Sequence, residues 1–171
     1  MNITKAALED LPKILQLQKL AYMSEAKLLN DYSIQPFTQT LPELEDEFAK
    51  TVILKLTDNK NNEIIGSVRA REENGRIFIG KLMVHPDHQD KGLGTSLLKA
   101  VEAFFTAPAA SHGQMASGAG QAVTANPAFE LFTSSKSEKN LHLYQKNGYR
   151  EFRREKGSED YEMVFLEHQP I

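Results

Sequence analysis

Apolar residues recur at helical spacing in four stretches, and each stretch predicts an amphipathic helix. The first begins at Asp10, a candidate cap, and places Leu11, Ile14 and Tyr22 on one face. The other three helices are expected over 40–49, where Thr40 and Glu43 have capping-box spacing, over Lys91–Phe105, and over Glu138–Asn147, with Ser137 as its cap and Gly148 as its end.

Shorter apolar and β-branched runs, separated by polar turns, predict strands. These runs are Asn2–Lys5, Thr51–Leu56, Glu63–Arg71, Arg76–Val84, Phe129–Thr133, Tyr149–Arg154 and Tyr161–Glu167. Arg76–Val84 becomes apolar on both faces toward its end, which is typical of a central strand. Antiparallel hairpins that feed a helix indicate the α/β (α+β) class.

The segment 106–128 interrupts this pattern with a composition of Ala, Gly, Ser, Gln and Pro. So long a stretch without periodicity predicts a flexible insert or a functional flap. The remaining elements fit one core. We therefore expect residues 1–171 to form a single domain.

Composition and net charge exclude several classes of protein function. A formal net charge of −3 leaves no electrostatic footprint for nucleic acid or an anionic membrane surface. The chain has no cysteine, which excludes disulfides, thiolate nucleophiles and cysteine zinc sites. No signal-peptide pattern or long apolar run is present, so a cytoplasmic location is expected. His85 and His88 lack the partners of a metal array, and no metal site is expected.

The stretch from Lys81 to Thr95 carries the clearest chemistry: a strand, a proline turn, two glycines and the start of a helix. A helix N-terminus favours an anion, and glycines let a phosphate approach the backbone closely. The glycine spacing fits neither a P-loop nor a dinucleotide fingerprint, because Leu97 stands where the latter needs a third small residue. A tight turn without any ligand is the other interpretation.

The pattern Gln-x-x-Gly-x-Gly over 89–94 resembles the coenzyme A signature of the GNAT family of N-acetyltransferases. The stretch 140–149, Asn-Leu-His-Leu-Tyr-Gln-Lys-Asn-Gly-Tyr, is similar to a second family element, with Tyr149 in place of Phe. Order and separation of the elements agree over most of the chain. The resemblance implies a mixed, mostly antiparallel central sheet flanked by helices, with parallel central strands splayed around the coenzyme.

The same resemblance implies acetyl-CoA as the acetyl-donor cosubstrate and assigns residues to it. Backbone groups of Met83 and Val84 are expected beside the acetyl group, where an amide N–H would stabilise an oxyanion. The expected coenzyme contacts are completed by Gln89, Asp90, Lys91, Gly92, Leu93, Gly94, Thr95, Asn140 and Tyr144.

Tyr144 is the expected general acid, since a phenol can protonate the departing thiolate; a core role is the alternative. Glu72, acting through a water molecule, is the expected general base, and Glu73 and Glu25 are the other candidates. An aromatic acceptor wall, by resemblance, would use Tyr22, Tyr32 and Phe37, and a hydrophobic core role for each stays open.

The sequence thus predicts an acetyl-CoA-dependent acyltransferase that acts on a primary amine of a small molecule or peptide by direct attack. A coenzyme-binding or regulatory module without turnover is the main alternative. A second alternative is a protein-interaction domain that uses residues 106–128. No nucleic-acid or membrane partner is expected, and a homodimer would be consistent with the family.

Overall fold

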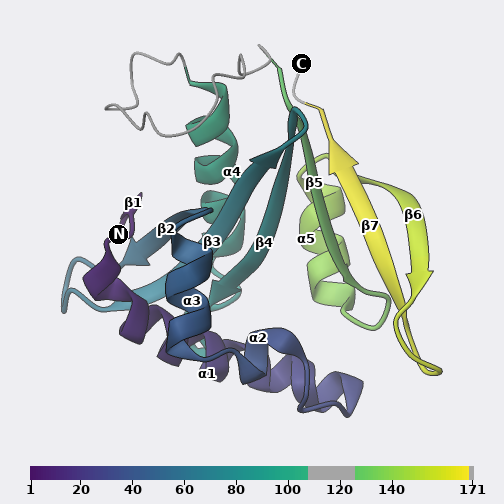
Figure 1. Cartoon of the computed structure of the whole chain (residues 1–171), viewed down its shortest axis with the longest axis horizontal. Helices are drawn as coiled ribbons and strands as arrows, with labels where there is room; N and C mark the ends of the chain where they lie inside the picture. The colour runs from purple at the N-terminus through teal and green to yellow at the C-terminus, as the bar shows by residue number, and fades with distance from the viewer. Residues whose placement is uncertain (108–125, 170–171) are drawn as a thin grey trace.

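In the computed structural model, which describes residues 1–107 and 126–169, seven strands form one sheet in the order β1-β2-β3-β4-β5-β7-β6 (Figure 1). The strands are β1 (Asn2–Lys5), β2 (Val52–Thr57), β3 (Ile64–Glu73), β4 (Arg76–Val84), β5 (Ala128–Ser134), β6 (Arg150–Lys156) and β7 (Glu162–His168). The α-helices are α1 (Leu11–Leu29), α2 (Gln35–Thr38), α3 (Leu41–Phe48), α4 (Leu93–Thr106) and α5 (Glu138–Lys146), and short 3₁₀ turns occupy Leu8–Asp10 and Pro86–His88.

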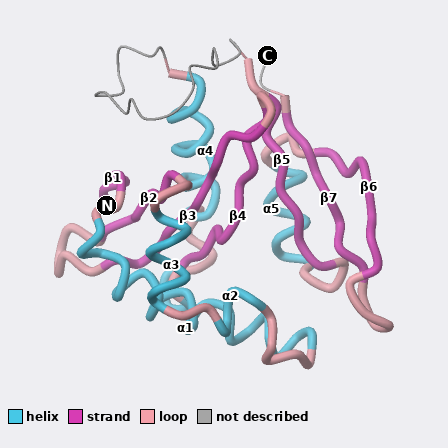
Figure 2. Tube along the Cα trace, in the orientation of Figure 1, coloured by secondary structure: helices cyan, strands magenta, loops and turns pink. Residues whose placement is uncertain are grey.

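Neighbouring strands are antiparallel except at the centre of the sheet. There β4 and β5 run parallel and pair over Arg76–Ala128, Ile77–Phe129 and Phe78–Glu130. Beyond these pairs the two strands diverge, which Figure 2 shows as a widening gap between the magenta tubes. The predicted mixed, mostly antiparallel sheet with splayed parallel central strands is confirmed.

Helices cover the two faces of the sheet unequally (Figure 1). On one face, α4 packs Leu97, Leu98 and Val101 into the larger buried cluster, which Tyr144 of α5 also joins. On the other face, α1 and α3 bury a second cluster with side chains such as Ile14. These helices lie over β2, β3 and β4, so the same face of β5, β7 and β6 is left without a described helix.

Two of the predicted helix caps are wrong, because tertiary partners take the side chains. Asp10 Oδ2 accepts from Ala7 N–H at 2.8 Å and from Lys55 Nζ at 2.7 Å, and it makes no cap hydrogen bond to α1. The Ser137 hydroxyl donates to the carboxylate of Glu25 on α1 and does not cap α5. Ser137 therefore ties α5 to α1.

Other local predictions are confirmed. Glu43 Oε2 accepts from Thr40 N–H at 2.7 Å, as the capping-box spacing predicts. Gly148 has φ of 89° at the end of α5, in the left-handed region. Helix α4 begins at Leu93 and not at Lys91. Of the predicted insert 106–128, residues 108–125 lie outside the described residues, so the interpretations placed on it stay predictions.

Candidate active site

A cleft of about 1560 Å³ opens where β4 and β5 diverge. Its lining comes from α1, α3, β3, β4, β5, the first turn of α4, and α5, with residues of β6 and β7 as well. Of the predicted site residues, the structure brings these to the cleft: Met83, Val84, Gln89, Asp90, Gly92, Leu93, Gly94, Thr95, Asn140 and Tyr144. Lys91 and Glu72 lie outside the lining.

A β-bulge shapes the end of β4. Ser67 pairs with Met83 and Arg69 pairs with Gly80, so two residues of β4, Lys81 and Leu82, oppose one residue of β3. Lys81 has φ of 50°, which belongs to the left-handed region and is uncommon for a side chain of this type. The bulge lies beyond the last β4–β5 pair, Phe78–Glu130, and Met83, which follows it, lines the cleft.

The turn after β4 is held by its own side chains. Gln89 Nε2 donates to the Val84 carbonyl at 3.1 Å, and His85 Nδ1 accepts from Asp87 N–H at 3.2 Å. Lys91 Nζ donates to the Asp87 carbonyl at 3.1 Å. Gln89 and Lys91 were predicted as coenzyme contacts, and here both side chains order the turn that leads into α4.

The first turn of α4 offers open backbone. Gly92 precedes the helix with φ of 76°, and no heavy atom lies within 4 Å of the position that a Cβ would occupy. A Cβ on Gly94 would lie 3.2 Å from Leu143 Cδ2, so this glycine lets α4 approach α5 closely. Asn147 Nδ2 donates to Thr95 Oγ1 at 3.3 Å across the same junction. The N–H groups at the start of a helix favour an anion, and here space in front of them is free.

Helix α5 supplies the two residues of the second motif. Asn140 Nδ2 donates to Thr133 Oγ1 at 3.3 Å, which fixes the amide beside β5. Tyr144 is 7 % exposed, and burial, followed by the charges of Tyr22 and Glu25, raises the pKa of its phenol above the usual value. The side chain of Tyr144 is therefore a protonated donor at neutral pH.

Tyr149, which replaces the Phe of the family pattern, lies 2 % exposed in the core. Its hydroxyl donates to Glu102 Oε1 on α4 at 2.7 Å. The ring centroids of Tyr149 and Tyr144 are 6.1 Å apart. The extra hydroxyl therefore joins α4 to the end of α5 and does not disturb the motif.

Glu25 is the carboxylate that lies near Tyr144. It lines the cleft, accepts a hydrogen bond from Ser137, and its charge contributes to the raised pKa of Tyr144. Sequence reasoning placed Glu25 on the acceptor side but chose Glu72 as the base. Glu25 follows Tyr22 by three positions, so helical spacing puts both on one face of α1. Glu72 is exposed on β3 and pairs across the sheet with Ile77.

A buried polar network, which the sequence analysis missed, borders the cleft beneath α1 and α3. Arg69 on β3 is 2 % exposed and donates through Nη1 to Glu47 Oε2 at 2.7 Å and to Gln39 Oε1 at 3.1 Å. Its Nη2 donates to Gln18 Oε1. Lys81 Nζ, from the β4 bulge, lies 3.4 Å from Glu47 Oε2. A signal existed: Gln18 sits four residues after Ile14 and four before Tyr22, on the apolar face of α1.

The charges in this network shift each other's ionisation. Burial would raise the pKa of Glu47, but the charge of Arg69, the hydrogen bond from Gln39 and the contact with Lys81 outweigh it and hold the pKa below its usual value. Burial, with the nearby Arg69 charge, lowers the pKa of Lys81. Glu47 is therefore a fixed carboxylate with a poor affinity for protons.

The open side of the cleft carries aromatic side chains. Tyr22 lines it, whereas Tyr32 and Phe37 stack edge to face with each other, with ring centroids 6.0 Å apart, outside the lining. Sequence reasoning did not pick out Phe132 and Phe165, which line the cleft from β5 and β7 with centroids 5.4 Å apart.

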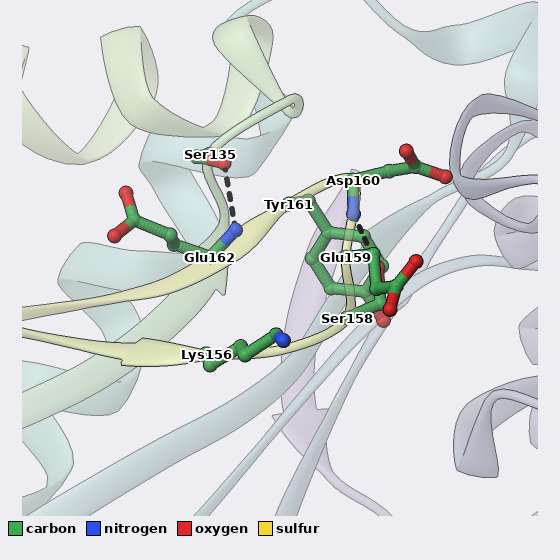
Figure 3. Close-up of a pocket in the computed structure, with 7 residues that line it drawn as sticks. All are labelled: Ser135, Lys156, Ser158, Glu159, Asp160, Tyr161 and Glu162. Carbon is green, nitrogen blue, oxygen red and sulfur yellow. Dashed lines mark hydrogen bonds between the residues drawn. The ribbon is translucent and has the colours of Figure 1, made fainter.

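The β6–β7 hairpin tip borders the same rim. A hollow of about 440 Å³ lies there, and Glu162 N–H donates to Ser135 Oγ at 3.0 Å. Figure 3 shows the seven residues that line it. Tyr161 lines both this hollow and the cleft. A Cβ added to Gly157 would lie 2.4 Å from Tyr161 Cε2, so the ring rests directly on the glycine.

A family model described as acetyltransferase (GNAT) domain matches residues 51–151, which span β2 to the start of β6 and include both motifs. The chain belongs to the GNAT acetyltransferase family. Its predicted activity class, an acyltransferase of this family that uses acetyl-CoA as donor, is confirmed at the level of the family. Comparison with curated proteins gave no match.

Solved structures share the fold of this GNAT domain at low identity. The PaiA N-acetyltransferase of Thermoplasma acidophilum in complex with coenzyme A has a TM-score of 0.69 at 13% identity, with 98% of each chain covered. The ribosomal-protein-S18-alanine N-acetyltransferase of Escherichia coli has a TM-score of 0.67 at 16% identity over 98% of this chain and 92% of that one. A phosphinothricin acetyltransferase of Sinorhizobium meliloti in complex with AcCoA reaches 0.70 at 14%, over 98% and 87%.

Two further observations concern the GNAT domain as a whole. Among the helices of residues 1–107 and 126–169, none combines the length and apolar character needed to cross a bilayer. Within the same residues, no three His, Cys, Asp or Glu side chains gather closely enough to hold a metal ion.

Proposed function

We propose that this GNAT acetyltransferase moves the acetyl group of acetyl-CoA to a primary amine by direct attack in a ternary complex. The observation that carries the proposal is the meeting of three features on one cleft: the open Gly92 turn at the start of α4, the β4 bulge before Met83, and the buried phenol of Tyr144. Acetyl-CoA, when bound, supplies an activated thioester carbonyl.

The start of α4 suits a pyrophosphate. Four N–H groups at a helix N-terminus lack partners within the helix, and the peptide dipole adds positive potential there. No heavy atom lies within 4 Å of the position of a Cβ on Gly92, so no side chain of this residue or its neighbours keeps an anion from the backbone there. We assign the pyrophosphate to the stretch from Asp90 to Thr95, with Asn140 contacting the pantetheine arm from α5.

Both a backbone amide and a side chain take part in the acetyl transfer. The amine nitrogen forms a bond to the thioester carbonyl carbon, and an amide N–H at the β4 bulge, near Met83, stabilises the oxyanion. When the C–S bond breaks, Tyr144 gives its proton to the departing thiolate sulfur, and the second proton lost by the acetylated nitrogen restores the phenol through solvent. The chain has no cysteine, so an acyl-cysteine intermediate is impossible.

Glu25 is the residue to which we assign the removal of the amine proton. An ammonium group must lose a proton before its nitrogen can attack, and Glu25 lines the cleft beside Tyr144. A water molecule between the amine and the carboxylate would complete the path. This assignment replaces Glu72, whose side chain points to solvent from β3, away from the cleft lining.

Calorimetric titration with acetyl-CoA, coenzyme A and NAD tests the binding half of the proposal. Saturable binding of the two coenzyme A species without an NAD response is expected. A Gly92→Val variant, in which a branched side chain stands in a turn with φ of 76°, should lose that binding, and circular dichroism checks that the strained variant is folded. If the wild-type protein is folded, as measured by circular dichroism, but binds neither coenzyme A species, the Gly92 turn is not a coenzyme-binding site.

Tyr144→Phe separates an enzyme from a coenzyme-binding module. Loss of a general acid typically costs about 10²–10⁴-fold in kcat, with acetyl-CoA affinity unchanged. Tyr149→Phe is the matched control, since Tyr149 lies five residues on and outside the cleft lining. Equal turnover in wild type and Tyr144→Phe would remove Tyr144 from the mechanism. Absence of turnover with every acceptor, with coenzyme binding intact, would favour the binding module.

A further inference from the structure

Two arginine–phenylalanine pairs flank the open side of the cleft. On one lip Arg71 of β3 pairs across the sheet with Phe78 of β4, and the guanidinium carbon lies 5.3 Å from the ring centroid. On the other lip Arg153 of β6 pairs with Phe165 of β7, at 3.9 Å. All four residues line the cleft. The divergence of β4 from β5 thus separates two similar cationic and aromatic rims.

Phe132 of β5 stands between these rims. It is 56 % exposed, pairs across the sheet with Phe165, and contacts that ring at a centroid distance of 5.4 Å. Phe78 and Phe165 lie on strands two spacings apart, and their partners on β5, Glu130 and Phe132, are two residues apart, so more than about 10 Å separates them. The exposed ring of Phe132, next to Phe165, gives this part of the cleft an apolar surface on which part of a ligand can pack.

The two guanidinium groups are available for an anion. Arg71 and Arg153 have side chains 53% and 45% exposed, and their carboxylate partners Glu73 and Glu155 are 53% and 51% exposed. Ion pairs this exposed contribute little to stability, so the arginine side chains can bind another anion in place of the carboxylate. By contrast, Glu130 on the same cleft wall is already bonded by Arg76, at 3.2 Å. A planar guanidinium that is held against a ring matches a carboxylate with two parallel hydrogen bonds.

We propose that the acceptor is an amine that also carries an apolar group and a carboxylate: the apolar group packs on Phe132, and Arg153 binds the carboxylate, with Arg71 on the opposite rim. This inference rests on the proposed acetyl transfer. The amine is directed toward Glu25 and the carboxylate toward Arg153, both of which line the cleft. At the rims, an acceptor with several positive charges would instead meet Arg71 and Arg153.

The same chemistry is present in a free apolar amino acid and in a short peptide, and matched probes separate the two. The first pair is L-phenylalanine and L-phenylalanine amide; the second is alanyl-phenylalanine and its C-terminal amide. Spermidine serves as the polycationic comparison. In each pair the two molecules have the same apolar group and differ in the carboxylate, so the ratio of their kcat/KM values measures carboxylate recognition.

At least one pair should favour the free carboxylate by about tenfold or more, because charge-assisted hydrogen bonds are roughly twice as strong as neutral ones. Arg153→Gln should reduce that ratio to near one. Arg154→Gln is the matched control: Arg154 is the next residue of β6, pairs with Glu151 and Glu162, and lies outside the cleft lining. Phe132→Ala should lower kcat/KM for both members of a pair.

A binding measurement keeps the inference separate from catalysis. N-acetyl-L-phenylalanine and N-acetyl-alanyl-phenylalanine, each beside its amide, are titrated into protein saturated with coenzyme A. If turnover is absent but a carboxylate is preferred and Arg153→Gln removes the preference, the proposed reaction fails and the acceptor site stands. If neither pair shows a preference in turnover or binding, if the preference survives Arg153→Gln, or if spermidine is the better acceptor, the inference is overturned.

Discussion

Removal of Arg69 should destabilise the fold far more than removal of any exposed arginine. Arg69 is 2 % exposed on β3 and donates to Gln18, Gln39 and Glu47, which belong to α1, the segment after α2, and α3. One side chain therefore joins three separate segments to the sheet beside the cleft. In Arg69→Met, a side chain of similar length fills the space but cannot donate.

The magnitude follows from the groups left behind. Glu47 loses its 2.7 Å partner, although Gln39 still donates to it at 2.7 Å, and buried Gln18 loses a charged donor. Each hydrogen bond to a charged group contributes about 1.5–3 kcal/mol. Release of the buried guanidinium, whose Nε has no partner among the described residues, offsets part of this loss. We expect a net loss of about 3 kcal/mol, or roughly 6–12 °C in Tm for a domain of this size.

Urea denaturation at pH 7, with thermal melts beside it, measures this loss. Arg71→Met is the matched control, because Arg71 lies two residues further along β3 with an exposed ion pair and should change the free energy of unfolding by less than about 1 kcal/mol. The pKa of Glu47 is lower in the folded state than in the unfolded chain, so its contribution is complete above its unfolded pKa, about 4.3, and is lost as pH falls through the lower folded value. The difference between wild type and Arg69→Met should therefore shrink below about pH 4. A loss under 1 kcal/mol at pH 7, or a difference that grows on acidification, would refute the reasoning.

Three further substitutions test other parts of the structure. Gly92→Ala places a Cβ in a left-handed position, which should cost about 1–2 kcal/mol in urea denaturation with no steric clash; an unchanged midpoint would mean that the turn relaxes freely. Gly157→Ala should push Tyr161 out of the cleft rim and lower kcat/KM for the acceptor while acetyl-CoA affinity in calorimetry stays constant. Tyr149→Phe removes the hydrogen bond to Glu102 and should cost about 1 kcal/mol of unfolding free energy with kcat unchanged; a large loss of kcat would give Tyr149 a role in catalysis.

Local sequence signals were sufficient for most of the elements, although not for α2, and for the turn that leads into α4. Periodicity located the helices, and Gly92 and Gly94 mark a turn whose geometry depends on residues adjacent in sequence. The chemistry of such a turn is set within a few residues, so the prediction needed no long-range contact. The cap at Ser137 failed for the opposite reason, because its partner Glu25 lies 112 residues away.

The acceptor side could not be predicted in the same way. Glu72 was chosen as the base because it lies at the end of a strand near the expected cleft. The direction of its side chain depends on strand register, which local sequence patterns do not specify. The pairing of Arg153 with Phe165 depends on a register shift between Glu151 and Arg153. A one-residue slip would reverse every side chain beyond it. These residues become a site only after β5, β6 and β7 are aligned.

The short parallel contact between β4 and β5 has a mechanical consequence. Three residue pairs at one end of the strands join the two halves of the sheet, and α4 and α5 pack against both halves on one face. A molecule that lies between β4 and β5 and contacts both strands would hold the two halves of the sheet together. We expect bound coenzyme to slow amide hydrogen exchange in both half-sheets together, including strands that it never touches.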